Sequence, residues 1–202
     1  ASDVYKRQEL TAWNWLSGGQ FVEQIVHTID GMVWSMNEQL PLAAFGSGGR
    51  AQRRDDGDVW DHYDVYFEYD HNVAAHISCR QWVGCHGEIV DRTVCEKGML
   101  VTPYRPHIQA DKRWRFRGER GNMYADTHVA FYRFLRSGTW KQTLESAANK
   151  TLVAIMGREA AHTGQRITWE QIKKSATRLV PEDLTMDTPL PPARIPRPGR
   201  AA

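Results

Sequence analysis

The stretch DHYDVYFEYDHNVAAHISCRQ, from Asp61 to Gln81, decides the fold class of this chain. Apolar and polar residues alternate on both sides of the turn Asp70–Asn72, which is the period of a half-buried strand. Two such segments joined by a short turn predict an antiparallel hairpin. The residues on its apolar face are Val65, Phe67, Tyr69, Val73, Ala75, Ile77 and Cys79.

Further short strands are expected on both sides of this hairpin, with no helical pattern between them. Consecutive strands without intervening helices favour an antiparallel sheet. The expected strands are Leu42–Gly46, Glu88–Cys95, Met99–Thr102 and Arg113–Arg117.

Helical periodicity frames this run of strands. Apolar residues recur at helical spacing from Phe21 to Ser35 and again in Met123–Arg136 and Leu144–His162. Thr168-Trp169-Glu170-Gln171 has the spacing of a capping box and predicts a short helix to about Ala176. The order helix, sheet, helices predicts an α+β fold: an open, mostly antiparallel sheet with helices on one face.

The ends of the chain differ from this central part. Residues 1–12 are expected to be non-native or linker sequence, because ASDVYKRQ resembles a translated sequencing adapter. The expected domain spans residues 13–180. Five prolines after residue 188 predict that 181–202 form an extended tail.

Composition excludes several classes of protein. The chain has 202 residues with 26 Lys+Arg against 24 Asp+Glu, a net charge of +2 that gives no general attraction to nucleic acid or anionic membranes. No apolar run reaches the roughly 18–20 residues of a membrane helix. Three cysteines without C-x-x-C spacing argue against a disulfide framework and a zinc ribbon. We expect no nucleic-acid partner, no membrane partner and no metal.

The most suggestive polar residues lie on the first helix. Glu23 and His27 are four residues apart, and Asp30 follows His27 by three, so all three are neighbours on a regular helix. A carboxylate beside an imidazole can orient it and raise its basicity, as a general base requires. Spacing alone also allows a surface pair or two metal ligands. Tyr124 and His128, on the Met123–Arg136 helix, are further candidates for a pocket.

Three other motifs carry weaker signals. Gly46–Arg50 (GSGGR) lacks both G-x-G-x-x-G and the Walker Lys-Ser/Thr, so a strand-to-loop connection is expected there. Cys85 and His86 are adjacent and would point to opposite faces of a strand. The basic run Arg113–Arg120 alternates with aromatic residues, which is typical of a strand with one solvated face.

Several segments together resemble the Gfo/Idh/MocA family, the group of glucose–fructose oxidoreductase and inositol dehydrogenase. The resemblance runs from about Trp13 to the C-terminus. Its segments are GGQFVEQIVHTIDGMVW (Gly18–Trp34), GSGGR (Gly46–Arg50), Asp61–Gln81, GREAAHTGQRITWEQ (Gly157–Gln171) and LPPARIPRPG (Leu190–Gly199).

The resemblance implies a two-domain enzyme whose N-terminal Rossmann domain binds NAD or NADP and whose C-terminal domain is the α+β part present here. No G-x-G-x-x-G occurs in the chain, so the cofactor is expected to bind mainly outside it, and residues 1–202 to bind NAD(P) very weakly. Glu96-Lys97-Gly98 looks similar to the family's Glu-Lys-Pro motif but follows a strand and has Gly in place of Pro.

The resemblance also assigns roles to site residues. His27 matches the family's catalytic histidine, which removes a hydroxyl proton while hydride leaves the same carbon. Glu23 stands where many members have Asp, so a carboxylate is kept but displaced by one methylene. Independently of the resemblance, their positions on the two helices make Asp30, Tyr124 and His128 candidates for contact with the substrate.

The leading hypothesis is the substrate-binding and catalytic-base half of an NAD(P)-dependent oxidoreductase acting on a sugar, polyol or related carbohydrate. An NAD-dependent glycosidase and a non-catalytic carbohydrate-binding or assembly domain are alternatives. Family members associate through the sheet face left free by the helices, so a homodimer or homotetramer is expected. A cytoplasmic location is the default expectation, with export left open.

Overall fold

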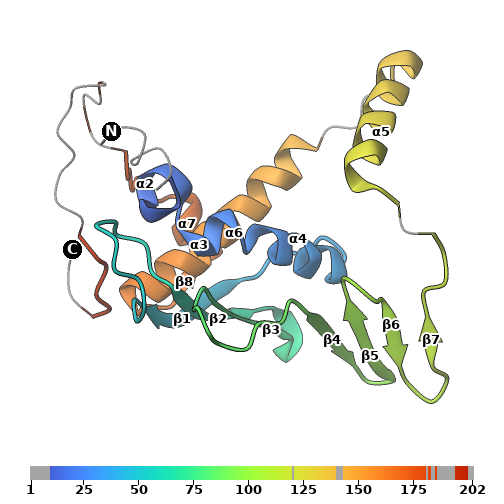
Figure 1. Cartoon of the computed structure of the whole chain (residues 1–202), viewed down its shortest axis with the longest axis horizontal. Helices are drawn as coiled ribbons and strands as arrows, with labels where there is room; N and C mark the ends of the chain where they lie inside the picture. Colours follow the sequence, from blue (N-terminus) through green and yellow to red (C-terminus); the bar gives the residue numbers. More distant parts are fainter. Residues whose placement is uncertain are drawn as a thin grey trace. The chain divides into compact units, whose positions relative to one another are not determined.

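The computed structural model describes residues 10–119, 121–139, 143–180, 182, 185 and 194–199. The chain divides into two compact units (Figure 1). The first consists of Ala1–Cys85 and Ala147–Ala202, and the second of His86–Ser146. The division falls inside the 13–180 segment that the sequence presents as one domain.

The first unit contains a sheet of four strands in the order β3-β2-β1-β8. All three pairings are antiparallel, and β2 and β3 form the hairpin predicted from Asp61–Gln81. The turn between them holds His71 and Asn72 at φ of 59° and 58°. The strands are β1 (Ala43–Gly49), β2 (His62–Glu68), β3 (Ala74–Arg80) and β8 (Ile167–Thr168).

Helical segments precede and follow the strands of this unit. They are η1 (Leu10–Ala12), α2 (Asn14–Ser17), α3 (Gln20–Glu23), α4 (Val26–Ser35), η2 (Asp70–Asn72), α6 (Leu144–Thr163, which begins in the second unit) and α7 (Trp169–Lys173). The predicted capping box of α7 is confirmed, because the Thr168 and Gln171 side chains bond each other's backbone N–H groups.

One face of this sheet carries the core. The alternation of β2 directs Tyr63, Val65 and Phe67 inward, where they pack with apolar residues of α3, α4 and α6. Asp64 and Tyr66 alternate with them and remain exposed on the opposite face. Helices on one face of an antiparallel sheet confirm the predicted α+β class.

The helix predicted for Phe21–Ser35 is broken into two. α3 ends at Glu23 and α4 begins at Val26. At the break, the Ile25 N–H donates to the Gln20 carbonyl at 3.3 Å, five residues back instead of four. Such a bond inserts an extra residue into the turn, and breaks of this kind are frequent at functional sites. The apolar periodicity did not reveal this break, because buried apolar residues continue across it, with Phe21 on α3 and Ile29 on α4.

The second unit is a separate antiparallel meander in the order β4-β5-β6-β7, so the strands form two sheets instead of one. Its elements are β4 (Asp91–Cys95), β5 (Gly98–Thr102), β6 (His107–Gln109), β7 (Trp114–Arg115) and α5 (Met123–Ser137). Glu96 and Lys97 form the two-residue turn between β4 and β5. β6 is absent from the strands predicted from sequence. Asn122 caps α5, its Oδ1 accepting from the N–H groups of Tyr124 and Ala125.

Part of the proline-rich tail follows the surface of the first unit. Trp60 Nε1 donates to the Pro196 carbonyl at 3.2 Å, and the Gly199 N–H donates to the Thr163 carbonyl at 3.1 Å. Residues 1–9 and most of 181–193 lie outside the described residues.

Candidate active site

The break between α3 and α4 positions the two residues that the sequence singles out as acid–base candidates. Glu23 is the last residue of α3 and His27 the second of α4, and both are exposed. The Glu23 carboxylate accepts two hydrogen bonds from Gln24 Nε2, at 2.9 and 2.7 Å. Among the described residues the His27 ring has no hydrogen-bond partner. No bond therefore joins Glu23 to His27, and the imidazole is left accessible to a substrate.

Asp30 has a partner on another helix. Lys150 Nζ of α6 donates to Asp30 Oδ1 at 2.6 Å and lies 3.2 Å from Glu38 Oε2. The hydrogen bond with Asp30 is the main cause that raises the pKa of Lys150, so this group stays charged. The Asp30 carboxylate thus connects α4 to α6, and its role toward a substrate stays a prediction.

A tryptophan that the sequence analysis did not assign lies on the same exposed face of α4. Trp34 follows His27 by seven residues, and 67% of its surface is exposed. Residues at i, i+3, i+4 and i+7 share a helix face, so His27, Asp30, Gly31 and Trp34 form one stripe, about 10 Å long. The helical spacing is a signal that could have placed Trp34 beside His27. We call His27, Asp30, Gly31 and Trp34 the α4 stripe.

Tyr124 and His128 belong to the second unit. Both are exposed on α5, and the His128 Nδ1–H donates to the Tyr124 carbonyl at 2.7 Å. They are one helical turn apart, as the sequence predicts, and their contact with a substrate stays a prediction.

Sequence reasoning missed an enclosed polar cluster under the sheet. Tyr63 Oη and His162 Nε2 are 3.0 Å apart, and the His162 ring packs edge-on against Trp60 with centroids 4.6 Å apart. Burial lowers the pKa of His162 to about 3, and the nearby Arg158 charge adds to this effect. Burial raises the pKa of Tyr63 above its usual value. Both groups are therefore neutral near pH 7 and belong to the core.

The Gly46–Gly49 segment, expected as a strand-to-loop connection, is strand throughout and is not a phosphate-binding loop. It forms most of β1 and pairs with β2 along its whole length. A Cβ on Gly48 would lie 2.4 Å from the His62 carbonyl oxygen, so this glycine permits close packing. The loop after β1 is held by the buried Asp61, which accepts from the N–H groups of Ala51, Gln52 and Arg53. This glycine-rich segment therefore offers no dinucleotide cradle.

The described residues contain neither a metal-binding cluster nor a membrane-spanning helix. Among them, no group of three or more His, Cys, Asp or Glu is placed to hold a metal ion. No helix in the described part of the chain is long and apolar enough to cross a bilayer.

No family model and no curated protein matches the sequence. The fold, however, is similar to solved oxidoreductases. An oxidoreductase from Thermotoga maritima has 20% identity and a TM-score of 0.64, with 78% of this chain and 49% of that chain covered. Aldose-aldose oxidoreductase from Caulobacter crescentus, complexed with glycerol, has 13% identity and a TM-score of 0.62, covering 77% and 49%.

The WlbA dehydrogenase from Bordetella pertussis, in complex with NADH and UDP-GlcNAcA, has 14% identity and a TM-score of 0.55, covering 83% of this chain and 50% of that chain. The chain therefore spans about half the length of each of these structures. At these identities the likeness concerns the fold. The chain thus shares its fold with about half of each of these oxidoreductases, in agreement with the C-terminal-domain fold that the sequence resemblance predicts.

Proposed function

We propose that this chain is the substrate-binding and catalytic-base part of an NAD(P)-dependent oxidoreductase that acts on a hydroxyl of a sugar, polyol or related carbohydrate. The observation that carries the proposal is the exposed His27 ring at the α3–α4 break, which has no hydrogen-bond partner among the described residues. An unpaired imidazole on a fold shared with oxidoreductases is suited to exchange a proton with a substrate hydroxyl.

In this proposal His27 acts as the general base. Its free ring nitrogen accepts the hydroxyl proton as the alcohol is oxidised, which a positioned base accelerates by about 10²–10⁴-fold. Glu23 contributes a negative charge at the end of α3, which favours the imidazolium that results. Because the sequence contains no G-x-G-x-x-G, the proposal assigns NAD(P) mainly to a part of the protein beyond this chain.

The α4 stripe supports a carbohydrate substrate. Aromatic faces pack on the C–H surfaces of sugars, and Trp34 presents such a face about 10 Å along the helix from His27. Two similar structures were solved with glycerol or a sugar nucleotide. A monosaccharide that meets both His27 and Trp34 would span the stripe.

The test uses the full-length enzyme with its own nucleotide-binding part. We expect His27→Ala to lower kcat by about two to four orders of magnitude and to leave NAD(P) affinity nearly unchanged. Glu23→Gln should lower kcat less than His27→Ala does, because the base is kept and only a neighbouring negative charge is lost. Steady-state kinetics from pH 5 to 10, over a panel of sugars and polyols, measure both effects.

His71→Ala is the matched control, since His71 is an exposed histidine of the β2–β3 turn. Its kcat should equal that of the wild type. Near-wild-type turnover of His27→Ala on the same substrate would contradict the proposed role of His27 as general base. Glu23 and His27 would then be ordinary surface residues.

A homodimer or larger even oligomer is part of the same proposal. The face of the first sheet opposite the core exposes Phe45 and Tyr66, whose ring centroids are 5.0 Å apart. A paired aromatic patch on an open sheet face is suited to a symmetric partner.

A further inference from the structure

A strongly basic segment belongs to the second unit and contains neither Glu23, His27 nor any residue of the α4 stripe. Residues 105–117 read RPHIQADKRWRFR, with five cationic side chains and one carboxylate. Within it, β6 and β7 pair antiparallel, with His107 opposite Arg115. Continuing this register places Gln109 opposite Arg113. Since alternate residues of a strand share a face, these four side chains leave one side of the sheet.

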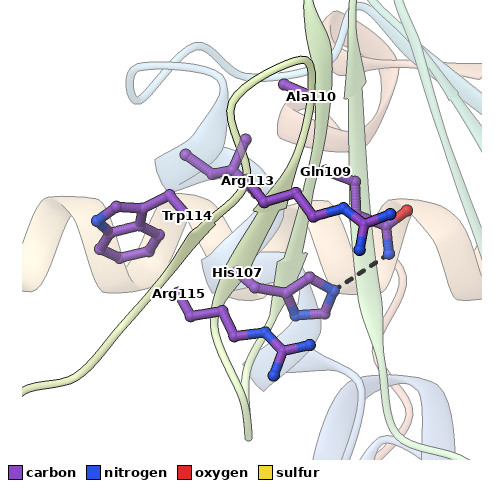
Figure 2. Close-up of a pocket in the computed structure, with 7 residues that line it drawn as sticks. His107, Gln109, Ala110, Arg113, Trp114 and Arg115 are labelled. Carbon is purple, nitrogen blue, oxygen red and sulfur yellow. Dashed lines mark hydrogen bonds between the residues drawn. The ribbon is translucent and has the colours of Figure 1, made fainter.

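Figure 2 shows this arrangement directly. The side chains of His107, Gln109, Arg113 and Arg115 extend to one side of the strands, and Trp114 points to the other. His107, Gln109, Arg113 and Arg115 are among the residues that line a surface cavity of about 340 Å³, a volume in the range of pockets that bind small molecules. No Asp or Glu is among the residues that line it. We call His107, Gln109, Arg113 and Arg115 the β6–β7 cluster.

The two arginines of this cluster lack the carboxylate partners that several arginines of the chain have. Arg50, Arg158 and Arg166 each form an ion pair with a carboxylate. Among the described residues, neither Arg113 nor Arg115 has a carboxylate or carbonyl partner. Two guanidinium groups on one strand face, two residues apart, repel each other unless an anion lies between them. Guanidinium groups also match phosphate and carboxylate oxygens with paired N–H donors.

Hydrogen bonds hold the other half of the cluster in place. A carbonyl oxygen only accepts, so His107 Nδ1 carries the proton that it donates to the Arg105 carbonyl at 2.8 Å. The His107 Nε2 lone pair then accepts from Gln109 Nε2 at 3.2 Å. One N–H and the carbonyl oxygen of the Gln109 amide remain for a ligand. The cluster therefore offers two cations beside a neutral donor and acceptor.

We propose that the β6–β7 cluster binds the phosphate or carboxylate group of a small organic anion, with Arg113 and Arg115 as the anion-binding pair and Gln109 contacting a neighbouring hydroxyl. The volume of the cavity matches one sugar-sized anion and favours a small ligand over an extended nucleic acid. This inference rests on the second unit alone, so it is independent of the role proposed for His27.

Binding is tested on the 202-residue chain with four probes. Inorganic phosphate, glucose 6-phosphate and glucuronate are the anionic probes, and glucose is the neutral probe. Calorimetry and ¹⁵N NMR titration at constant ionic strength measure the binding of each. The expected result is saturable binding of an anionic probe at millimolar Kd or tighter, with shifts centred on the amides of residues 107–115, and at least tenfold weaker binding of glucose. Phosphate and glucuronate distinguish the two sources of the anion.

Variants of equal charge separate a site from general attraction. Arg113→Gln/Arg115→Gln should weaken binding about tenfold or more, since each lost guanidinium removes charge-assisted hydrogen bonds. Arg105→Gln/Arg117→Gln makes the same change of charge in the same segment, outside the cavity lining, and should weaken binding less than threefold. Arg113→Lys keeps the charge without the paired donors and should be intermediate.

Three results would overturn the inference, and two of them need only the wild-type chain. One is the absence of NMR shifts in 107–115 with every anionic probe at 20 mM. Another is binding of a single-stranded oligonucleotide at least tenfold tighter than any small anion at the same amides. The third is equal weakening by the two double variants, which would show attraction to the basic segment as a whole.

Discussion

His162 illustrates how the environment of one residue defines its chemistry. Its ring lies between Trp60 and Tyr63, and burial lowers its pKa to about 3. His27 has the same side chain on an exposed helix face. The enclosed histidine is held neutral and packs against aromatic rings, whereas the exposed one is accessible from solvent. Residue type alone does not distinguish the two.

The pKa of His162 predicts a loss of stability in acid. The unfolded chain takes up a proton near pH 6.5, whereas the folded chain does so only near pH 3, so stability falls as the pH drops between these values. The slope from this group is at most about 1.4 kcal/mol per pH unit, or roughly 2 kcal/mol between pH 6.5 and 5. Urea unfolding at a series of pH values measures it.

In His162→Gln this part of the slope should disappear, while His128→Gln, a change on exposed α5, should keep it. Parallel pH profiles for wild type and His162→Gln would mean that the folded protein protonates His162 without cost.

At the scale of elements, α6 is the helix that organises the first unit. Its buried residues pack on the sheet, and Arg158 crosses to the Gly18 carbonyl at 3.1 Å, before α3. Lys150 connects it to α4 through Asp30. The position of the α3–α4 break, and so of His27, depends on these contacts.

Close packing at Gly157 predicts that a single methyl group destabilises this unit. A Cβ there would lie 2.6 Å from Phe21 Cε1 and 2.9 Å from Phe67 Cζ. Gly157→Ala gains about 1 kcal/mol of helix propensity but overpacks the core by about 1–3 kcal/mol, so we expect net destabilisation of up to about 2 kcal/mol. Chemical denaturation measures the change.

Ala148→Gly, on the exposed part of α6, calibrates the propensity term and should cost about 1 kcal/mol. A Gly157→Ala variant that is more stable than the wild type would show that the two phenylalanines move aside without strain.

At the scale of the molecule, the two units differ in how well their side chains are buried. The first has a continuous core of residues with almost no exposed surface. Among the described residues of 86–146, no side chain is fully buried, and Ile108, Trp114 and Phe116 are exposed. A meander of four short strands without a covered face is weakly stable by itself.

This difference predicts uneven hydrogen exchange. Amides of β4–β7 should exchange through local opening, at rates at least tenfold higher than amides of β2 and β3, whose exchange requires loss of the core. Mass-spectrometric exchange from seconds to hours on the 202-residue chain measures both. Equal protection of the amides in the two sheets would contradict the prediction that the second sheet opens without unfolding of the first.

The exposed aromatic patch of the first sheet predicts the effect of charge on assembly. If Phe45 and Tyr66 lie in a symmetric interface, the double change Phe45→Glu/Tyr66→Glu should weaken association of the full-length enzyme at least a hundredfold, because four like charges would be buried in each dimer. Sedimentation at micromolar to tens of micromolar concentrations measures the shift.

Phe116→Glu introduces one such negative charge per chain, on an exposed aromatic residue of the second unit, and should leave the oligomer intact. A wild-type enzyme that is strictly monomeric at tens of micromolar would rule out the proposed interface.

The sequence by itself determined the hairpin Asp61–Gln81, the helices α5, α6 and α7 and the α+β class, because alternation, helical periodicity and a capping box are local patterns. It also singled out Glu23 and His27 by their spacing. Only the tertiary structure decided that the strands form two sheets, that α3 and α4 are separate and that Trp34 joins the exposed stripe while His162 is enclosed. The physical reason is that strand pairing and burial depend on contacts between distant segments, which the local period of a sequence does not contain.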